Sequence, residues 1–254
     1  MSTQLAPDTA PAGARPLAGK TALVTGGSRG IGAAIVRRLS ADGAQVAFTY
    51  ASAKDQADAV AEATGALAIQ ADNADHDAVR AAVSHTAEQF GGLDILVNNA
   101  GIAHLAPIED VSLEEFDRLI AVNVRGVFSA IQAATAQLGQ GGRIITIGSV
   151  SADRAPAPGI SVYALTKAAV TGFTRGLARE LGPRGITVNT VQPGPTDTDM
   201  NPDAGPAAEW MKQLTTVGHY GKPADIASAV AYLASPEARF VSGTTWNVDG
   251  GSSI

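Results

Sequence analysis

The amino-acid sequence predicts one α/β domain built on a doubly wound parallel sheet. Two observations carry this prediction: short β-branched runs alternate with longer helical patterns, and no linker or internal repeat interrupts the alternation after residue 17. Strands that alternate with helices form parallel sheets whose two faces are covered by helices. The chain has 254 residues, 45% of them hydrophobic and 17% charged, which suffices for one substantial core.

The first half of the chain contains four expected strands, each followed by a helical pattern or a turn. The strands are expected at residues 21–25, 45–50, 67–70 and 93–98. After the first strand, Ile31, Ile35 and Leu39 recur every four residues and mark the apolar face of a helix. Further helices are expected around 55–64 and from about 79 to 90.

The second half continues the alternation. A long helix is expected from about 112 to 138, followed by a fifth strand at 143–148. A helix at about 161–181 leads to a sixth strand at 186–192, and a last strand is expected at 245–248. Residues 1–16 are Ala/Pro-rich without the apolar segment of a secretory signal, so we expect a flexible tail before a domain at 17–254.

Charge and residue types exclude several classes of function. The formal net charge of -6 disfavours a nucleic-acid or anionic-membrane partner, because both need a basic surface. The sequence has no cysteine and its four histidines show no close pairing, so no metal site is expected. No apolar run approaches the roughly 18 residues that span a bilayer. We therefore expect a cytoplasmic protein.

A glycine-rich turn follows the first expected strand. It reads Thr25-Gly26-Gly27-Ser28-Arg29-Gly30-Ile31-Gly32 and opens a helix, which is the setting of a Rossmann-like dinucleotide site. Gly26 permits the tight turn, Gly30 lets the backbone approach a pyrophosphate, and Gly32 allows close helix packing. The helix N-terminus offers unpaired N–H groups and partial positive charge to the phosphates. A glycine-rich turn without a ligand is the alternative.

Tyr163 and Lys167 lie four residues apart at the start of an expected helix, so they share one face of it. A free phenol loses its proton only near pH 10. A neighbouring ammonium favours the phenolate, which suits a group that moves a proton near neutral pH. Taken alone, the pair is more typical of an ordinary helix face.

Polar residues also stand where the fourth and fifth expected strands end. Asn98-Asn99-Ala100-Gly101 ends the fourth strand and Ser149 ends the fifth, at the sheet edge where doubly wound folds bind ligands. Asn123 lies among apolar residues of the long helix. Turn chemistry is the alternative for Asn98 and Asn99, and a helix kink or cap is the alternative for Asn123.

In this order the motifs resemble the short-chain dehydrogenase/reductase family over roughly residues 17–252. The match comprises the Gly-x3-Gly-x-Gly turn, the Asn98–Gly101 motif, Asn123, Ser149, Tyr163-Ala-Leu-Thr-Lys167 and Pro193-Gly194. The resemblance implies hydride transfer between nicotinamide and a carbonyl carbon, with Tyr163 as general acid/base. It implies that Lys167 holds the nicotinamide ribose, that Ser149 hydrogen-bonds the substrate oxygen, and that Asn123 supports a water-mediated proton relay through Lys167.

The serine departs from the family's spacing. The family usually places it thirteen residues before the tyrosine, and Val150 stands at that position. Ser149 lies fourteen residues before Tyr163 and follows the strand directly, so we predict Ser149 and a longer loop after it. Ser151, twelve residues before the tyrosine, is the alternative.

The second strand predicts NADP(H) as the cofactor. It ends at Tyr50 without an acidic residue, which would bind a ribose 2′-hydroxyl and repel a 2′-phosphate. Arg29 and Lys54 could pair with that phosphate, and solvated surface charges are the alternative. The resemblance adds contacts to the adenine and the carboxamide. The predicted cofactor-binding residues are Gly26, Ser28, Arg29, Gly30, Ile31, Gly32, Tyr50, Lys54, Asp72, Asn73, Asn99, Ala100, Gly101, Tyr163, Lys167, Pro193, Gly194, Thr196 and Thr198.

Residues 199–221 are expected to form a substrate lid, as this segment does in the family. Met200, Trp210, Met211 and Leu214 could fold over an apolar ligand, and an amphipathic surface helix explains them equally well. The segment that includes His104 and Leu105 could line the opposite wall, although His104 could also be a simple loop residue.

The leading hypothesis is an NADPH-dependent carbonyl reductase that acts on a small carbonyl or alcohol substrate. The resemblance implies a homotetramer, and the identity of the substrate stays open. An NAD-dependent alcohol dehydrogenase and a non-catalytic nucleotide-binding or sensor protein are the alternatives. The intact set of Asn123, Ser149, Tyr163 and Lys167 favours an enzyme, because binding alone needs no proton donor at the nicotinamide.

Overall fold

The computed structural model describes residues 15–254, so most of the tail expected at 1–16 lies outside the described residues. Within them, seven strands form one parallel sheet in the order β3-β2-β1-β4-β5-β6-β7. This confirms the predicted doubly wound fold. The strands are β1 (Thr21–Val24), β2 (Gln45–Tyr50), β3 (Leu67–Gln70), β4 (Leu93–Asn98), β5 (Leu138–Ile147), β6 (Thr187–Pro193) and β7 (Thr245–Val248).

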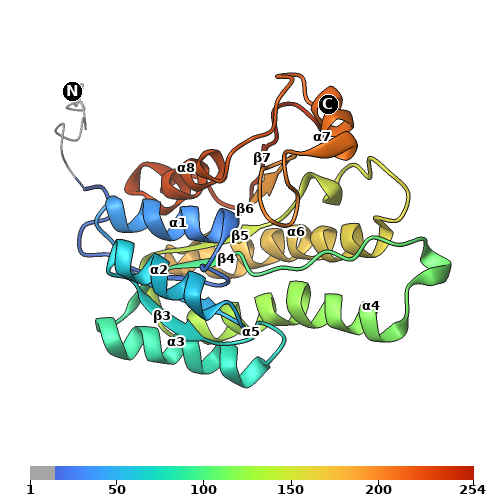
Figure 1. The fold of residues 1–254 in the computed structure, drawn as a ribbon. Coiled ribbons are helices and arrows are strands. Elements are labelled where there is room, and N and C mark those ends of the chain that lie inside the picture. The colour runs from blue at the N-terminus through green and yellow to red at the C-terminus, as the bar shows by residue number, and fades with distance from the viewer. Residues whose placement is uncertain (1–14) are drawn as a thin grey trace.

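Helices cover both faces of the sheet, with α1 and α8 on one side and α3 and α5 on the other (Figure 1). Each connects successive parallel strands, as the alternating sequence predicts. The helices are α1 (Gly30–Ala41), α2 (Lys54–Thr64), α3 (His76–Phe90), α4 (Leu113–Ile120), α5 (Gly126–Thr135), α6 (Ser161–Leu181), α7 (Gly205–Leu214) and α8 (Pro223–Ala234). No helix within residues 15–254 is long and apolar enough to cross a membrane.

Two buried clusters fill the spaces between the sheet and its helical layers. Successive side chains of β1 enter different clusters, since Val24 packs with α1 and α8 whereas Leu23 packs with α3, α5 and α6. This alternation follows from the period of two along a strand. Ile35 and Leu39, two residues of the predicted helix face, are fully buried in the first cluster. Because helices cover both faces of the sheet, the carboxyl ends of its strands are held in fixed positions. The candidate functional site lies at those ends.

The long helix expected at 112–138 is interrupted. It begins with the capping box of Ser112 and Glu115, but a π-helical turn at Ala121–Arg125 separates α4 from α5. The side chain of Asn73 donates a hydrogen bond of 2.7 Å to the carbonyl of Val122 inside that turn. Apolar periodicity does not detect one extra residue in a turn, so the sequence predicted a continuous helix.

The fifth strand begins earlier than expected. It runs from Leu138 rather than from Arg143, because Leu138 pairs with Leu93 before a register shift in the ladder between β4 and β5. The glycine-rich start of the strand hid this pairing from the sequence prediction. The carboxyl end of β5 is nevertheless close to where it was predicted, directly before Gly148 and Ser149.

Candidate functional site

A cavity of about 470 Å³ opens along the carboxyl ends of the strands. The chain leaves β1 toward β2 and β3 on one side and returns to β4 on the other, so the cavity lies at the switch point of the sheet. Most of the predicted cofactor-binding residues line it. These are Gly26, Ser28, Arg29, Gly30, Ile31, Gly32, Tyr50, Asp72, Asn73, Asn99, Ala100, Gly101, Tyr163, Lys167, Pro193, Gly194, Thr196 and Thr198.

The glycine turn forms an open cradle before α1. Gly30 adopts a φ of +52°, which favours glycine, and a side chain built on it would meet only Thr198, at 3.4 Å. Gly32 packs so closely that an added Cβ would collide with the carbonyl oxygen of Gly26 and the amide of Asn99. The cradle thus presents backbone and a helix N-terminus to the cavity, which fits the phosphates of a dinucleotide.

The motif that begins at Asn98 is fastened to the glycine turn. The Thr25 hydroxyl accepts hydrogen bonds from the backbone N–H groups of Asn99 and Ala100 at 3.0 and 3.1 Å. The Asn99 amide donates to the carbonyls of Thr25 and Gly26 at 3.0 and 2.9 Å. Turn chemistry, the alternative for the asparagines, is therefore part of the site, because it holds the floor of the cradle.

Tyr163 and Lys167 share a face of α6 and both line the cavity. The ammonium of Lys167 lies 5.6 Å from the centre of the tyrosine ring and donates a 3.1 Å hydrogen bond to the carbonyl of Ile147. Only 6% of the Lys167 surface is exposed, and this one carbonyl leaves two of its N–H groups for other partners. A buried, positioned cation beside a phenol suits proton transfer.

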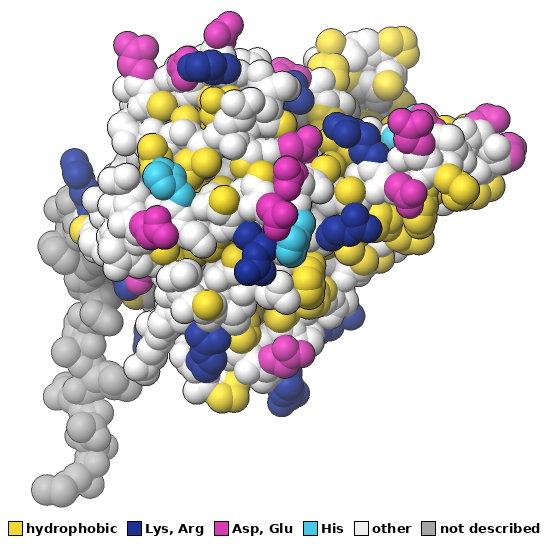
Figure 2. Space-filling view, turned by 90° about the horizontal axis from the view of Figure 1, so that it is seen from below, with side chains coloured by type: hydrophobic (Ala, Val, Ile, Leu, Met, Phe, Trp, Pro, Cys, Tyr) yellow, Lys and Arg dark blue, Asp and Glu magenta, His cyan; other side chains and the backbone are white. Residues whose placement is uncertain are grey.

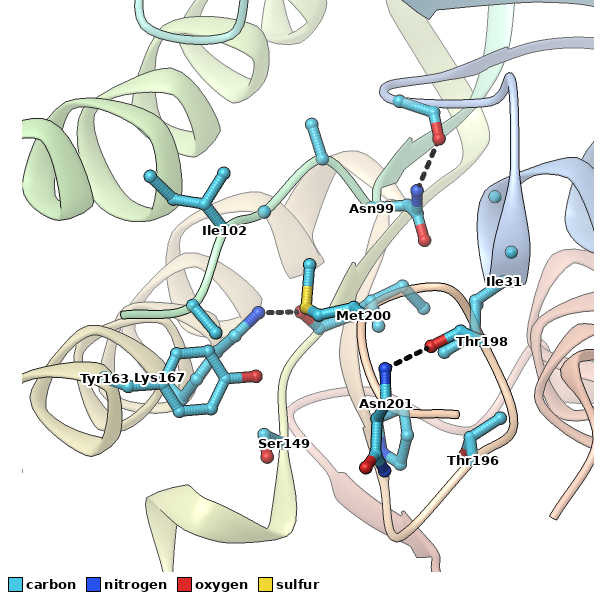
Figure 3. Close-up of a pocket in the computed structure, with 18 of the residues that line it drawn as sticks. Ile31, Asn99, Ile102, Ser149, Tyr163, Lys167, Thr196, Thr198, Met200 and Asn201 are labelled. Carbon is cyan, nitrogen blue, oxygen red and sulfur yellow. Dashed lines mark hydrogen bonds between the residues drawn. The ribbon is translucent and has the colours of Figure 1, made fainter. Parts of the chain in front are cut away.

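Ser149 follows β5 and faces the same space. Figure 3 shows Ser149, Tyr163 and Lys167 on one side of the pocket, with Thr196, Thr198 and Asn201 opposite and Met200 between them. The Ser149 hydroxyl accepts a 3.1 Å hydrogen bond from the backbone N–H of Ser151, so its own proton is free to be donated. Ser151, the alternative, is 8% exposed and also lines the cavity.

Asn123 is not among the lining residues but lies directly behind them. Its amide oxygen accepts from the N–H of Ile102 at 2.9 Å, and its amide nitrogen donates to the Ile102 carbonyl and the Thr166 hydroxyl at 2.9 and 3.1 Å. It sits in the π-helical turn, a local distortion that often marks functional sites. Thr166 is the neighbour of Lys167, so this buried amide couples the turn to the face of α6 that carries the lysine.

The two cations predicted for a 2′-phosphate differ in position. Arg29 lines the cavity, and its guanidinium lies 3.7 Å from the Asp199 carboxylate in an exposed pair. Lys54 does not line the cavity; its ammonium pairs with Asp58, one helical turn away, at 2.6 Å. The hydrogen bond to Asp58 and that residue's charge raise the pKa of Lys54. Arg29 thus lies in the cavity and Lys54 lies outside it on the surface of α2, so the contact of Lys54 with a 2′-phosphate stays a prediction.

The expected lid contains helix α7 between two irregular segments. Met200, Met211 and Leu214 line the cavity, whereas Trp210 does not and is 39% exposed. The Tyr220 hydroxyl connects parts of the segment, because it lies 3.3 Å from the Asn201 amide oxygen and 3.2 Å from the Met211 sulfur and can donate its single proton to either.

The opposite wall contains Leu105 rather than His104. Leu105 lines the cavity, and the His104 ring lies 3.2 Å from the Glu115 carboxylate outside it. The simple loop role, which the sequence left open for His104, therefore fits its position. In the described part of the chain, no group of His, Asp or Glu side chains could hold a metal ion.

Several polar residues of the cavity wall were not predicted from the sequence, among them Arg118, Arg154 and Ser252. Arg118 projects from α4, and Arg154 and Ser252 meet beside the serine loop. No motif marks them. Arg154 and Ser252 are 98 positions apart, and only the pairing of β7 with β6 brings the end of the chain to this edge.

Comparisons with known proteins agree with this architecture. A family model described as enoyl-(acyl carrier protein) reductase matches residues 26–253. A cyclic-di-GMP-binding biofilm dispersal mediator protein from Escherichia coli K12 is 49% identical over 232 residues, covering 91% of this chain and 96% of that protein. The 3-oxoacyl-[acyl-carrier-protein] reductase FabG of Staphylococcus aureus is 44% identical over 242 residues, covering 91% and 97%.

A solved structure shares the whole fold. A short-chain dehydrogenase from Burkholderia cenocepacia J2315, in complex with NADP, is 54% identical with a TM-score of 0.92, covering 94% of this chain and 100% of that chain. The glycine cradle, the tyrosine–lysine pair and these matches agree with one another. The chain belongs to the short-chain dehydrogenase/reductase family of oxidoreductases.

Proposed function

We propose that this protein is an NADPH-dependent reductase that converts a ketone or aldehyde to an alcohol. The observation that carries the proposal is one continuous cavity with a glycine cradle and Arg29 at one end and Ser149, Tyr163 and Lys167 at the other. The bound NADP of the Burkholderia relative supports the choice of cofactor, because it is carried on the same fold at 54% identity.

Different residues of the cavity would bind different parts of the cofactor. The cradle from Gly26 to Gly32 would hold the phosphates at the N-terminus of α1, and Arg29 would pair with a 2′-phosphate. Asp72 would lie beside the adenosine, and Thr196 and Thr198 beside the carboxamide. Asn73 already donates its amide to Val122, so its contribution to the cofactor would come from its backbone and its shape.

The catalytic residues act on the substrate oxygen. When bound, the nicotinamide supplies the hydride or takes it back. Ser149 donates a hydrogen bond to the carbonyl oxygen and orients it. Tyr163 transfers its phenolic proton to that oxygen, and the ammonium of Lys167 stabilises the phenolate that is left. Asn123 holds Ile102 and Thr166 in place and supports reprotonation through Lys167. In alcohol oxidation the proton moves in the opposite direction.

The lid and the oligomer complete the proposal. Residues 199–221 would close over the substrate with Met200, Met211 and Leu214. The protein would be a homotetramer, since Phe128 on α5 and Leu165 on α6 leave 44% and 49% of their surfaces exposed. Figure 2 shows apolar side chains among interspersed charges on the face seen from below. Light scattering that gives four chain masses would agree with a tetramer. The cytoplasmic location stays a prediction.

The proposal is tested by mixing the purified protein with a panel of ketones and aldehydes and measuring the decrease in NADPH absorbance. The same assay is run in parallel with NADH. We expect rapid oxidation of NADPH with one group of substrates. In Tyr163→Phe, turnover falls by about 10²- to 10⁴-fold, the contribution of a general acid, while NADPH binding is retained. Tyr232→Phe is the matched control, because Tyr232 packs on Trp246 away from the cavity. Normal turnover in Tyr163→Phe would contradict the mechanism, and a preference for NADH would contradict the cofactor.

A second candidate function follows from the Escherichia coli relative, whose name describes a cyclic-di-GMP-binding protein. A non-catalytic binding protein needs the cradle but not the tyrosine–lysine pair. Calorimetric titration with cyclic-di-GMP, with and without NADPH, tests this candidate directly. Tight binding that NADPH abolishes, combined with no turnover of any carbonyl, would favour it over the reductase.

A further inference from the structure

The segment after β7 packs against the loop that carries Ser149. The guanidinium of Arg154 donates two hydrogen bonds from one nitrogen, to the main-chain oxygens of Ser252 and Ile254, both at 2.9 Å. Arg154 lies five residues after Ser149, and both Arg154 and Ser252 line the cavity. Residues 252–254 are thus hydrogen-bonded to the loop that carries Ser149.

A second set of hydrogen bonds joins the same loop to the final residues through a buried glutamine. Gln192 of β6 is fully buried, and its amide donates to the Asp153 carboxylate at 2.6 Å and to the Asn247 oxygen at 3.1 Å. Asn247 in turn donates to the Ser253 hydroxyl at 3.0 Å. The serine loop, two strands and the final residues therefore share one hydrogen-bonded network. Because this network is anchored on the buried amide of Gln192, it restricts the relative positions of its members.

The final residues are shaped into a turn by one carboxylate. Asp249 accepts hydrogen bonds from the N–H groups of Gly251 and Ser253 at 3.0 and 2.9 Å, and from the Ser252 hydroxyl at 3.3 Å. Gly251 has a φ of +75°, a conformation that suits glycine. The turn is what places the oxygens of Ser252 and Ile254 within reach of one guanidinium.

The same turn also contacts the end of the lid. The Gly250 carbonyl accepts from the N–H groups of Thr216 and Val217 at 2.8 and 3.2 Å, and from the Thr216 hydroxyl at 2.8 Å. A Cβ added to Gly251 would collide with the Thr216 hydroxyl, so the two backbones fit closely. The turn therefore lies between the serine loop on one side and the lid on the other.

We propose that residues 249–254, the C-terminal brace, set the distance between the serine loop and the lid. Arg154 is then a positioning residue for Ser149. This inference deepens the proposed reductase function and rests on it. A displacement of about 1 Å at a reacting group can lower a rate about 100-fold. The brace would thus control how the substrate carbonyl is oriented, without touching the cofactor cradle.

The first experiment measures the brace without any substrate. Hydrogen–deuterium exchange of residues 149–156 is compared between the unaltered protein, Arg154→Gln and Gly251→Ala, which loosen the brace from its two sides. We expect faster exchange of this loop in both variants and unchanged exchange in the glycine turn at 25–32. Arg184→Gln is the matched control, because Arg184 also donates to two main-chain oxygens, those of Thr135 and Leu138, but away from the cavity.

The second experiment measures the consequence for the reaction. In Arg154→Gln we expect kcat/KM for a carbonyl substrate to fall about tenfold or more, with the dissociation constant for NADPH unchanged. Arg154→Lys should recover part of the loss, because both hydrogen bonds come from one nitrogen that an ammonium can replace, although the shorter lysine side chain reaches less far. A role in folding alone would lower the melting temperature without changing kcat/KM per folded molecule, and Arg184→Gln calibrates that effect.

The two experiments separate the brace from the function on which it rests. If the unaltered protein turns over no carbonyl, the proposed function fails, and the exchange data alone then decide whether the brace holds the serine loop. Unchanged exchange at 149–156 in both variants would overturn the brace. Faster exchange with unchanged kcat/KM would overturn its positioning role. Faster exchange together with the loss of kcat/KM supports the proposal.

Discussion

The two ends of the cavity are built in different ways. The cofactor end consists of turns at adjacent strand ends, where the Thr25 hydroxyl and the Asn99 amide each bind backbone groups of the neighbouring turn. The substrate end consists of three segments that the sheet alone does not bring together: the loop after Ser149, the lid at 199–221 and the C-terminal brace. The shared fold therefore constrains the positions of residues at the cofactor end strongly. At the substrate end those positions depend on contacts of individual side chains.

We expect the most severe loss from a change at Gly32, which tests whether the cofactor end tolerates any displacement of its backbone. Gly32→Ala forces a methyl group against the Gly26 carbonyl and the Asn99 amide. Overpacking of this kind costs about 1–3 kcal/mol of unfolding free energy. Because the displaced groups form the cradle, we also expect the loss of a hydrogen bond to the charged phosphates, about 3 kcal/mol, which lowers NADPH affinity by about 100-fold. Fluorescence titration measures it. Gly139→Ala, where nothing lies within 4 Å of the added methyl, should leave affinity unchanged; equal losses in both variants would contradict a specific role for the cradle.

The next prediction concerns the choice between the two cofactors. Arg29→Ala removes the one predicted phosphate-binding cation that lines the cavity. A hydrogen bond to a charged group contributes about 1.5–3 kcal/mol, so the dissociation constant for NADPH should rise about 10- to 100-fold while that for NADH changes little. Lys54→Ala should have almost no effect, since Lys54 pairs with Asp58 outside the cavity. A large effect of Lys54→Ala would show that it moves when the cofactor binds.

An intermediate effect is expected where the two ends of the cavity meet. Asn73 lines the cofactor end, and its amide holds the Val122 carbonyl in the π-helical turn that carries Asn123. Asn73→Ala leaves that buried carbonyl without its partner, which costs about 1–3 kcal/mol of unfolding free energy. Urea unfolding measures the loss. We expect kcat to fall as well, because Asn123 positions Thr166 beside Lys167; loss of stability with normal kcat would separate the two ends.

The sequence predicted the cofactor end of the cavity better than the substrate end. It predicted the sheet, the glycine cradle, Tyr163 and Lys167 because each is encoded by local spacing at the end of a strand. It predicted a continuous helix around Asn123 without the π-helical turn, because apolar periodicity does not reveal one extra residue in a turn; the Asn73 amide that binds the Val122 carbonyl there lies 49 positions away. It did not predict that Lys54 pairs with Asp58, because the sequence does not reveal which carboxylate lies beside a surface lysine. It missed Arg154, whose partners lie about 100 positions away.

The smallest expected effect is a pH dependence at the substrate end. Burial raises the pKa of the Asp249 carboxyl, but hydrogen bonds from Ser253, Gly251 and Ser252 lower it more, so that its pKa lies below the usual value of 3.8. A lowered pKa in the folded state means that the ionised carboxylate stabilises the protein above about pH 4, and that this contribution is lost as the pH falls through the folded-state value.

Asp249→Asn should therefore destabilise the protein by about 1 kcal/mol at most at pH 7, because the carboxylate is only partly buried. The difference from the unaltered protein should shrink as the pH falls below 3.8 through the folded-state pKa, where the native carboxyl itself becomes protonated. Melting curves between pH 3 and pH 7 measure it. The cofactor end offers the contrast, since its turns are held by backbone groups and a threonine hydroxyl that do not titrate in this range. A difference between the two proteins that stays constant with pH would mean that the charge of Asp249 does not shape the brace, and that the shape of its side chain alone does.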